Sequence, residues 1–488
     1  MNYLFYIVIF ISVIGLLFLP PLFWYRLKSD FFSKQALKQL VSKKCVFFSS
    51  YVIQKAIKVS LKHRQNLFLD YLLNNKITAA ARLIKYHDEE LSVLLKAFDK
   101  PLQAISFFEK KLKKRHKNDE FSAWLALLLE TTGNPARAAI AWDNIRLPQK
   151  LYSYLRAHYF SHLAQIALKN GDLAFASRQF YKAVKLFNRS NAFYEEGETY
   201  LKLGTIYRIS FIDDMAETLF LSALKIFTSL CFEKGIAKAY AYLGMLMTGE
   251  ERFNEAEDYL NKSLQIYNTL KYELESAEIL NQLALLFLLQ KEYKKAQSFI
   301  KTAQKKHSLL KNQEGIAFSL DLLANCYWKQ KDLANTIKFA AKAADVYEKC
   351  SNISGFLDSL YLQAQALFES DNSTESETVL RKIIAIGKKD SGCFYLANAY
   401  NLLGIIYVKR KDLSRAKGLF QQSLDLEQRG VRSKALAADY TNLGLVEIFR
   451  GHEDEAKKNL QTALGFACEI EDDDLCEQIR KHLNKLSN

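Results

Sequence analysis

Apolar and small residues recur along residues 151–470 with a period of 40, and eight consecutive copies align in one register. One column of this alignment holds leucine in seven of the eight copies, and the next column holds only glycine or alanine. A third column, twelve positions further on, holds alanine in six copies. A fixed period of this length is typical of proteins in which each structural repeat stacks on the next.

Each copy contains two helical patterns. In the copy at residues 191–230, Leu203 and Gly204 belong to a run of positions spaced i, i+3, i+4 and i+7, which is one face of a helix. Ala216 and Phe220 belong to a second such run, and turn-forming residues separate the two runs in other copies. We therefore expect a helix, a short turn and an antiparallel helix in every copy. We expect the small residues to mark the points where two helices approach closely. Stacking of one repeat on the next then buries the apolar faces that a single hairpin leaves exposed.

In the first helix of each copy, the columns hold in order a large residue, Leu, either Gly or Ala, and Tyr. In the second helix they hold Ala, Phe and Ala. This order resembles the tetratricopeptide repeat (TPR) family, over residues 151–470 of 488. The period of 40 exceeds the roughly 34 residues usual in that family, and no copy ends in the family's proline. In this the chain is similar to the longer TPRs of kinesin light chains and of peptide-sensing bacterial regulators. The resemblance implies an all-α fold, a right-handed α-solenoid of helix–turn–helix repeats.

The start of the chain has a different character. Residues 3–25 carry no charge, and thirteen of the seventeen residues from Tyr3 to Leu19 are Leu, Ile, Val or Phe. This composition predicts a single transmembrane helix ahead of the repeats. The alternative is a cleaved signal peptide, but no basic segment precedes the apolar run and no small-x-small site follows it.

The positive charge of the chain is concentrated beside this predicted span. The net charge is +15, and residues 1–150 hold 24 Lys and Arg against 11 Asp and Glu, a net of +13, which leaves +2 for the rest. Ten of these basic residues lie in the segment 26–65. The positive-inside rule then predicts a cytoplasmic solenoid on a single-pass protein, in a bacterial inner membrane. We expect the basic segment to contact anionic lipid. Nucleic acid is the weaker alternative, because no nucleic-acid-reading motif accompanies the charge.

The remaining segments complete the predicted organisation. Residues 66–150 show helical periodicity without the regular repeat, and we interpret them as irregular helical hairpins with a degenerate TPR. The eight repeats occupy 151–470. An acidic start and two apolar positions in 471–488 predict a capping helix over the last repeat.

The sequence offers few groups for catalysis. It contains no Gly-x-Gly-x-x-Gly, Gly-x-x-x-x-Gly-Lys, Gly-x-Ser-x-Gly or His-Glu-x-x-His motif. The seven cysteines include no Cys-x-x-Cys pair. His158 and His162 are one helical turn apart, but no third ligand lies near them in the sequence, and we interpret them as surface histidines. We expect neither an enzyme nor a bound metal or cofactor.

The resemblance places binding on the first helix of each repeat, which lines a concave surface in the TPR family. The positions that flank the Leu-Gly/Ala pair there are the candidates for a peptide-binding groove: Lys202, Arg208, Asn281, Asp321, Asn325, Trp328, Tyr361, Phe368, Asn401 and Asn442. Asparagine amides both donate to and accept from a peptide backbone, and the aromatic residues add apolar contacts. The carboxylate clamp of chaperone-binding TPRs is not present in its usual placement.

Two hypotheses for function follow from this organisation. The first is a membrane-anchored scaffold or adaptor that binds other proteins or peptides at the cytoplasmic face. The alternative is a regulator in which a peptide or small ligand changes the solenoid and so controls a partner's activity.

Overall fold

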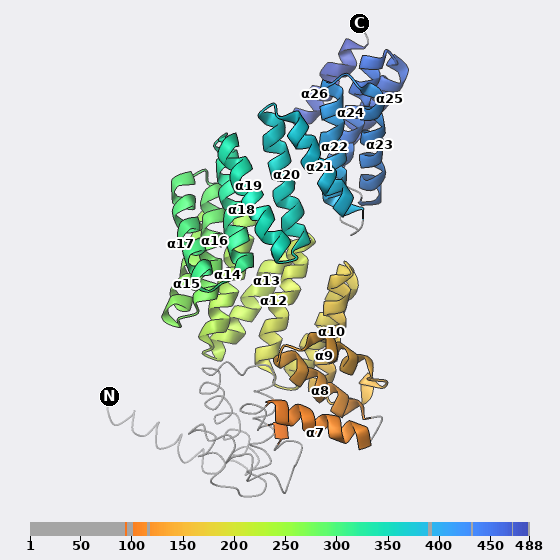
Figure 1. Ribbon diagram of the computed structural model, residues 1–488. Helices are drawn as coiled ribbons and strands as arrows, with labels where there is room; N and C mark the ends of the chain where they lie inside the picture. Colours follow the sequence, from red (N-terminus) through yellow and green to blue (C-terminus); the bar gives the residue numbers. More distant parts are fainter. Residues whose placement is uncertain are drawn as a thin grey trace, which may run out of the picture. The chain divides into compact units, whose positions relative to one another are not determined.

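The computed structural model describes residues 93–94, 101–114, 118–388, 393–430, 433–470 and 472–486 (Figure 1). The predicted anchor at 3–25, the basic segment at 26–65 and the first of the irregular hairpins lie outside these residues. Among the helices that the structure does describe, none combines the length and apolarity needed to cross a membrane. The all-α expectation is confirmed for the described residues, which form twenty α-helices and one 3-10 helix. The right-handed sense of the solenoid stays a prediction.

The chain divides into two compact units, which we describe separately. Unit 1 extends to Leu270 and unit 2 begins at Lys271. Unit 1 contains α7 (Pro101–Lys114), α8 (Asp119–Thr131), α9 (Pro135–Asp143), η1 (Pro148–Lys150), α10 (Ser153–Lys169), α11 (Leu173–Arg189), α12 (Phe193–Ile209), α13 (Asp213–Ser229), α14 (Glu233–Gly249) and α15 (Phe253–Thr269).

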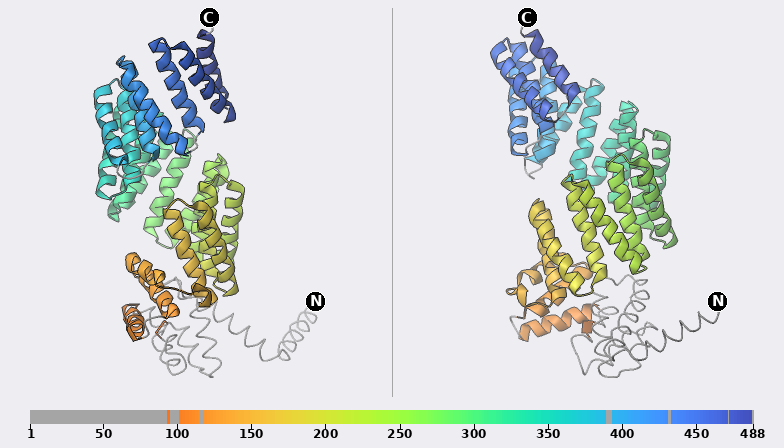
Figure 2. Two further views of the ribbon diagram at one scale, coloured as in Figure 1. Left: turned by 90° about the vertical axis from the view of Figure 1, so that its right-hand side faces the viewer. Right: turned by 180° about the vertical axis from the view of Figure 1, so that it is seen from behind.

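Unit 2 continues the same alternation of helix and short turn. It contains α16 (Glu273–Leu289), α17 (Tyr293–Leu309), α18 (Gln313–Lys329), α19 (Leu333–Lys349), α20 (Ile353–Glu369), α21 (Ser373–Gly387), α22 (Cys393–Lys409), α23 (Leu413–Gly430), α24 (Ser433–Arg450), α25 (Glu453–Glu469) and α26 (Asp473–Lys485). Consecutive helices pack against each other as antiparallel neighbours within each unit (Figures 1 and 2).

The turns between helices repeat one backbone geometry. After many of the described helices one residue adopts a left-handed conformation, for example Phe211 with φ 57° and Lys331 with φ 61°. The next amide then bonds back to the helix, as Ile212 N does to Tyr207 O at 2.9 Å. This bond satisfies a carbonyl that the helix end leaves without a partner. It offsets the cost that non-glycine residues incur in this conformation.

The glycine and alanine column lies where paired helices touch. A Cβ built on Gly244 of α14 would lie 2.6 Å from Leu260 Cγ and 3.2 Å from the carbonyl oxygen of Ala256, both on α15. Gly444 has the same relation to Leu460, and Gly204 and Gly404 are covered by Phe220 and Phe420. The expectation that these positions must be small because two helices come close is confirmed.

The irregular part of unit 1 packs onto its first regular helix. Trp124 of α8 and Tyr154 of α10 are fully buried, with ring centroids 6.0 Å apart. They belong to one apolar cluster that extends from Leu94 to Ala192. In unit 2, Cys476 and Ile479 of α26 are buried in a cluster with residues of α24 and α25.

We predict that Gly244→Ala destabilises the protein by about 1–3 kcal/mol, because the added methyl overpacks the α14–α15 contact. Gly249→Ala in the same helix is the matched control, since a Cβ there meets nothing within 4 Å. Alanine is the better helix former by ~1 kcal/mol, so the control is expected to be neutral or stabilising. Thermal unfolding followed by circular dichroism measures both. Equal effects would contradict the close approach.

Candidate functional site

Unit 2 presents a row of neighbouring first helices, α16, α18, α20, α22 and α24, each packed beside the next. We call these the A helices. On four of them the positions spaced i, i+4 and i+7 are partly exposed. They form what we call the A-helix stripe: Asp321, Asn325 and Trp328; Tyr361, Gln365 and Phe368; Asn401, Ile405 and Val408; Thr441, Leu445 and Ile448. This shared face contains six of the ten predicted groove residues and no lysine or arginine.

Asn281 does not lie on the surface where the sequence placed it. Its side chain is 1% exposed, and it accepts a hydrogen bond from Ser319 Oγ at 3.0 Å. Its amide nitrogen lies 3.3 Å from His307 Nε2. The position on α16 that was expected to hold a peptide backbone instead holds α16, α17 and α18 together.

Three further candidates form polar links between A helices. Ser359 of α20 donates to Asp321 Oδ1 of α18 at 3.2 Å. Asn401 of α22 donates to Asp439 of α24, and Asn442 donates to Asn401 Oδ1 at 3.3 Å. These links join residues about one repeat apart, so adjacent repeats are connected by side chains as well as by apolar contact. Asn401, Asn442 and Asp321 therefore have structural partners even though each is partly exposed.

Asn325 bonds within its own helix. Its amide donates to the main-chain carbonyl of Asp321 at 3.0 Å and to the Asp321 carboxylate at 3.2 Å. Asn325 is partly exposed, and no described residue donates a hydrogen bond to its side-chain oxygen. A peptide amide would find an acceptor at this point.

The three aromatic candidates are brought onto the one stripe, half-buried. Trp328 packs against Ala324, Ala340 and Leu362, while Tyr361 and Phe368 pack against the main core cluster of unit 2. Lysine ammonium groups lie over two of the rings, Lys331 at 5.3 Å from the Trp328 centroid and Lys409 at 4.1 Å from the Phe368 centroid. Each ring thus packs against neighbouring side chains and is also partly exposed to solvent.

Lys202 and Arg208 lie on α12 in unit 1, whereas the other eight candidates lie on helices of unit 2. Arg208 is half-buried near the end of its helix. Lys202 instead lines a small cavity with His158 and His162. The interpretation of these histidines as surface residues is wrong, because His158 is 8% exposed. The i, i+4 spacing was the only sequence signal that pointed to them.

Carboxyl groups on the A helices have pKa values above their usual range. Burial, together with the nearby Asp358 carboxylate, raises the pKa of Asp321 to about 7. Burial also raises the pKa of Asp439 to about 6. The polar links therefore include carboxyls that exchange protons close to neutral pH.

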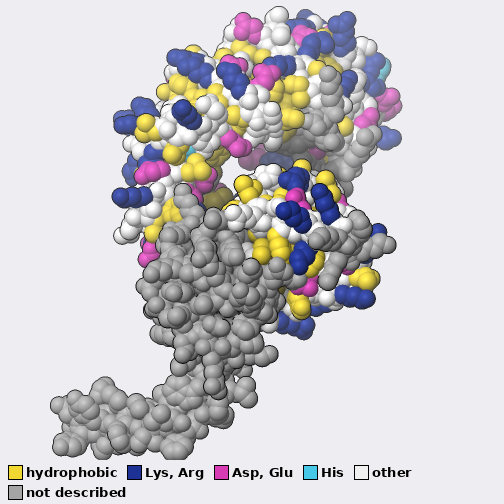
Figure 3. All heavy atoms as spheres, turned by 60° about the horizontal axis from the view of Figure 1, so that its bottom comes forward, with side chains coloured by type: hydrophobic (Ala, Val, Ile, Leu, Met, Phe, Trp, Pro, Cys, Tyr) yellow, Lys and Arg dark blue, Asp and Glu magenta, His cyan; other side chains and the backbone are white. Residues whose placement is uncertain are grey.

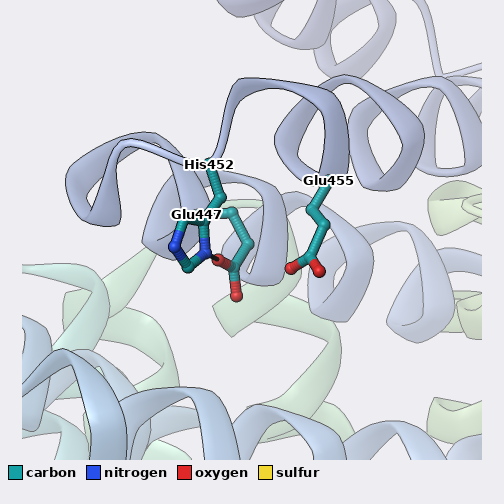
Figure 4. A group of neighbouring side chains, drawn as sticks. All are labelled: Glu447, His452 and Glu455. Atoms are coloured by element: carbon teal, nitrogen blue, oxygen red, sulfur yellow. Dashed lines mark hydrogen bonds and ion pairs between the residues drawn. The ribbon is translucent and has the colours of Figure 1, made fainter.

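One cluster in the described residues has the composition of a metal centre. Glu447, His452 and Glu455 offer ligand atoms within 4.8 Å of one another (Figure 4). However, Lys417 Nζ lies 2.7 Å and an Arg450 nitrogen 3.1 Å from Glu447 Oε1. Two cations already compensate this buried carboxylate, and they would repel a metal ion. The cluster is best understood as an ion-pair network.

The comparisons with known proteins concern the repeats. Residues 235–308 match the tetratricopeptide repeat family. The matched segment covers α15, α16 and most of α14 and α17. The same small and large positions recur in the other helix pairs, so the match supports a TPR repeat protein. Among curated proteins, none matches the chain by sequence.

Solved structures of TPR-containing proteins are similar in outline. The apo quorum sensor NprR from B. thuringiensis is 12% identical with a TM-score of 0.49, covering 71% of this chain and 97% of its own. Apo RapI is 14% identical with a TM-score of 0.44, covering 57% and 99%. The STAND protein PH0952 from Pyrococcus horikoshii, which has a TPR sensor, is 15% identical with a TM-score of 0.48, covering 91% and 65%. Values this low establish neither a shared function nor a shared ligand.

We predict that the stability of unit 2 depends on pH through Asp321. Its pKa is about 7 in the folded protein and about 3.9 in an unfolded chain. Between these values the folded carboxyl keeps a proton that the unfolded one has lost, so stability falls as pH rises through this window. The penalty is about 1.4 kcal/mol per unit of pKa shift.

Asp321→Asn keeps an acceptor for Ser359 and removes this titration, so the variant is expected to lose less stability between pH 4 and 7 than the native protein. Thermal unfolding across that range is the measurement. Asp345→Asn, at an exposed position of α19, is the control. Parallel pH profiles for all three proteins would exclude a role for Asp321.

Proposed function

We propose that the protein is a membrane-anchored TPR scaffold whose A-helix stripe binds an extended segment of a partner protein or peptide. The observation that carries the proposal is the partial exposure of the same i, i+4, i+7 positions on four adjacent helices. A continuous face of this kind, built on rigid helices, presents side chains at regular intervals. Such a surface suits a chain that is itself extended.

The chemistry of the stripe indicates what the partner segment carries. On α18 the stripe offers polar groups beside Trp328, and on α20 it offers the rings of Tyr361 and Phe368. On α22 and α24 it consists mainly of aliphatic side chains such as Ile405. Interfaces concentrate binding energy in a few buried apolar and aromatic anchors. We infer that the segment has apolar or aromatic residues toward one end and backbone or polar groups near Asn325.

The anchor belongs to the same proposal. Residues 3–25 would cross the membrane once, the basic segment 26–65 would contact anionic lipid, and the repeats would lie in the cytoplasm of a bacterial cell. Basic and acidic side chains are interspersed with hydrophobic ones on the described surface in Figure 3. On this face, the mixture leaves no continuous patch of positive charge that would attract nucleic acid, and it favours a protein or peptide partner.

The second candidate is a regulator in which a bound ligand changes a partner's activity. The observation that favours it is the cavity around Lys202, where buried polar groups lack partners. A change in compactness on adding ligand, followed by small-angle X-ray scattering, would distinguish this regulator from a passive scaffold.

We predict that Trp328→Ala together with Phe368→Ala weakens partner binding by roughly 2 kcal/mol, about 30-fold in Kd. Partners are first identified by affinity capture and mass spectrometry with the detergent-solubilised chain, and the affinity of each is then measured with the variants. Phe339→Ala is the matched control, because this half-buried ring stacks on Tyr327 from α19, outside the stripe.

The control corrects for lost packing, since Trp328 and Phe368 contribute to the core as well. The proposal requires the double variant to lose far more affinity than the control at comparable thermal stability. If both bind the partner as the native chain does, the stripe is not the binding surface.

We predict that the repeats stay on the cytoplasmic side when the full chain is inserted into glycosylating membranes. Asn188, Asn261, Asn352 and Asn372 each begin an Asn-x-Ser/Thr acceptor sequence, and they are expected to remain unmodified because they never enter the lumen. A gel shift reversed by endoglycosidase reports any glycan. Modification of any one of them would place the repeats across the membrane and overturn the proposed topology.

A further inference from the structure

A cavity of about 50 Å³ lies within unit 1, lined by residues of α8, α10, α11 and α12. At roughly 10–15 Å³ per water molecule, it has room for about four waters. Its polar lining consists of Glu130, His158, Ser161, His162, Gln165, Tyr194, Glu195, Glu198, Thr199 and Lys202. The proposed partner surface lies in unit 2 and shares none of these residues.

Two histidines that line this cavity carry unsatisfied atoms. The Nε2 atoms of both His158 and His162 are buried and have no hydrogen-bond partner. Buried polar atoms are nearly always paired, and an unpaired one destabilises the fold. Burial, assisted by the Lys202 charge, lowers the pKa of His158 to about 3. The ring is therefore neutral at pH 7 and can donate from Nε2.

Lys202 brings a positive charge into the same space. In the part of the chain that the structure describes, its ammonium has no hydrogen bond or ion pair, and the Phe180 ring centroid 6.0 Å away is its one recorded contact. Burial lowers the pKa of this lysine. By contrast, Lys238, which reaches the same region, pairs with Glu198 at 2.6 Å. Lys202 is thus a partly buried cation that makes no direct ion pair, although the Glu198 and Glu130 carboxylates lie close enough to act on its charge.

The carboxyl group of Glu130 is a negatively charged counterpart of Lys202 in the lining of the same cavity. It accepts a hydrogen bond from the Trp142 indole at 2.8 Å, and His162 Nδ1 lies 3.9 Å from it. Within the described residues, no lysine or arginine lies at ion-pair distance from its carboxylate. Burial raises the pKa of Glu130. The cavity lining thus includes a carboxylate and an ammonium that act on each other electrostatically. In the described part of the chain, the two form no ion pair at contact distance.

We propose that this cavity binds a small zwitterion of the amino-acid type, whose carboxylate contacts Lys202 and whose ammonium contacts Glu130. The histidine Nε2 atoms complete the hydrogen bonds of the ligand carboxylate. An amino group, an α-carbon and a carboxylate would take the place of these waters. A metal ion is disfavoured by the Lys202 charge, and an anion without an ammonium would leave Glu130 uncompensated.

The test is isothermal titration calorimetry on the detergent-solubilised full chain. The probes are the twenty common amino acids one at a time, acetate as a carboxylate alone, methylammonium as an ammonium alone, and zinc chloride. We expect at least one amino acid to bind with a stoichiometry of one, more tightly than acetate or methylammonium by about tenfold or more, since each lacks one charge-assisted contact.

The variants locate the site. Lys202→Met and Glu130→Gln are each expected to weaken amino-acid binding by about tenfold or more, while Lys185→Met, an exposed lysine of α11 outside the cavity, leaves it unchanged. Lys202→Met removes a partly buried charge that makes no direct ion pair, so its melting temperature without ligand should not fall. A melting temperature that does not fall would show that the variant loses ligand binding without losing its fold.

Three results would overturn the proposal. The first is that no amino acid binds the native chain. The second is that acetate binds as tightly as every amino acid and Glu130→Gln changes nothing, which would make the cavity a simple anion site. The third is that zinc binds there and competes with the amino acid, which would make the histidines metal ligands.

Discussion

The close approach of paired helices is the constraint on which the rest of the structure depends. At Gly244 the first helix has no room for a methyl group, because Leu260 and the backbone of Ala256 already lie against it. The same contact recurs at Gly444. Helices this close exclude water from the surface between them, so the apolar faces of each helix pair are buried when one repeat stacks on the next.

This packing also explains which parts were predictable. The helices and their turns follow from local periodicity and from small residues at fixed spacing, and both are visible in the sequence. The burial of Asn281 is not, because it depends on Ser319 of the next repeat and His307 of the helix between them. A position that faces solvent in an isolated hairpin is covered once a second hairpin stacks on it.

The same reasoning applies to the candidate sites. Trp328, Tyr361 and Phe368 do share a face, as their i and i+7 positions imply, yet all three are half-buried against neighbouring side chains. His158 and His162 were expected at the surface, because the i, i+4 spacing cannot show that α8 and α12 enclose them. Sequence spacing identifies residues on one side of a helix, but what covers that side depends on helices far away along the chain.

The central claim is that a partner lies along the A-helix stripe of unit 2, and site-specific photo-crosslinking tests it most directly. A benzophenone amino acid is placed at Gln365, a stripe position on α20, or at Lys342, an exposed position on α19, in the full chain expressed in cells. The account predicts a discrete crosslinked partner from position 365 and none from position 342 after illumination. The same partner captured equally from both positions, or captured only from position 342, would contradict it.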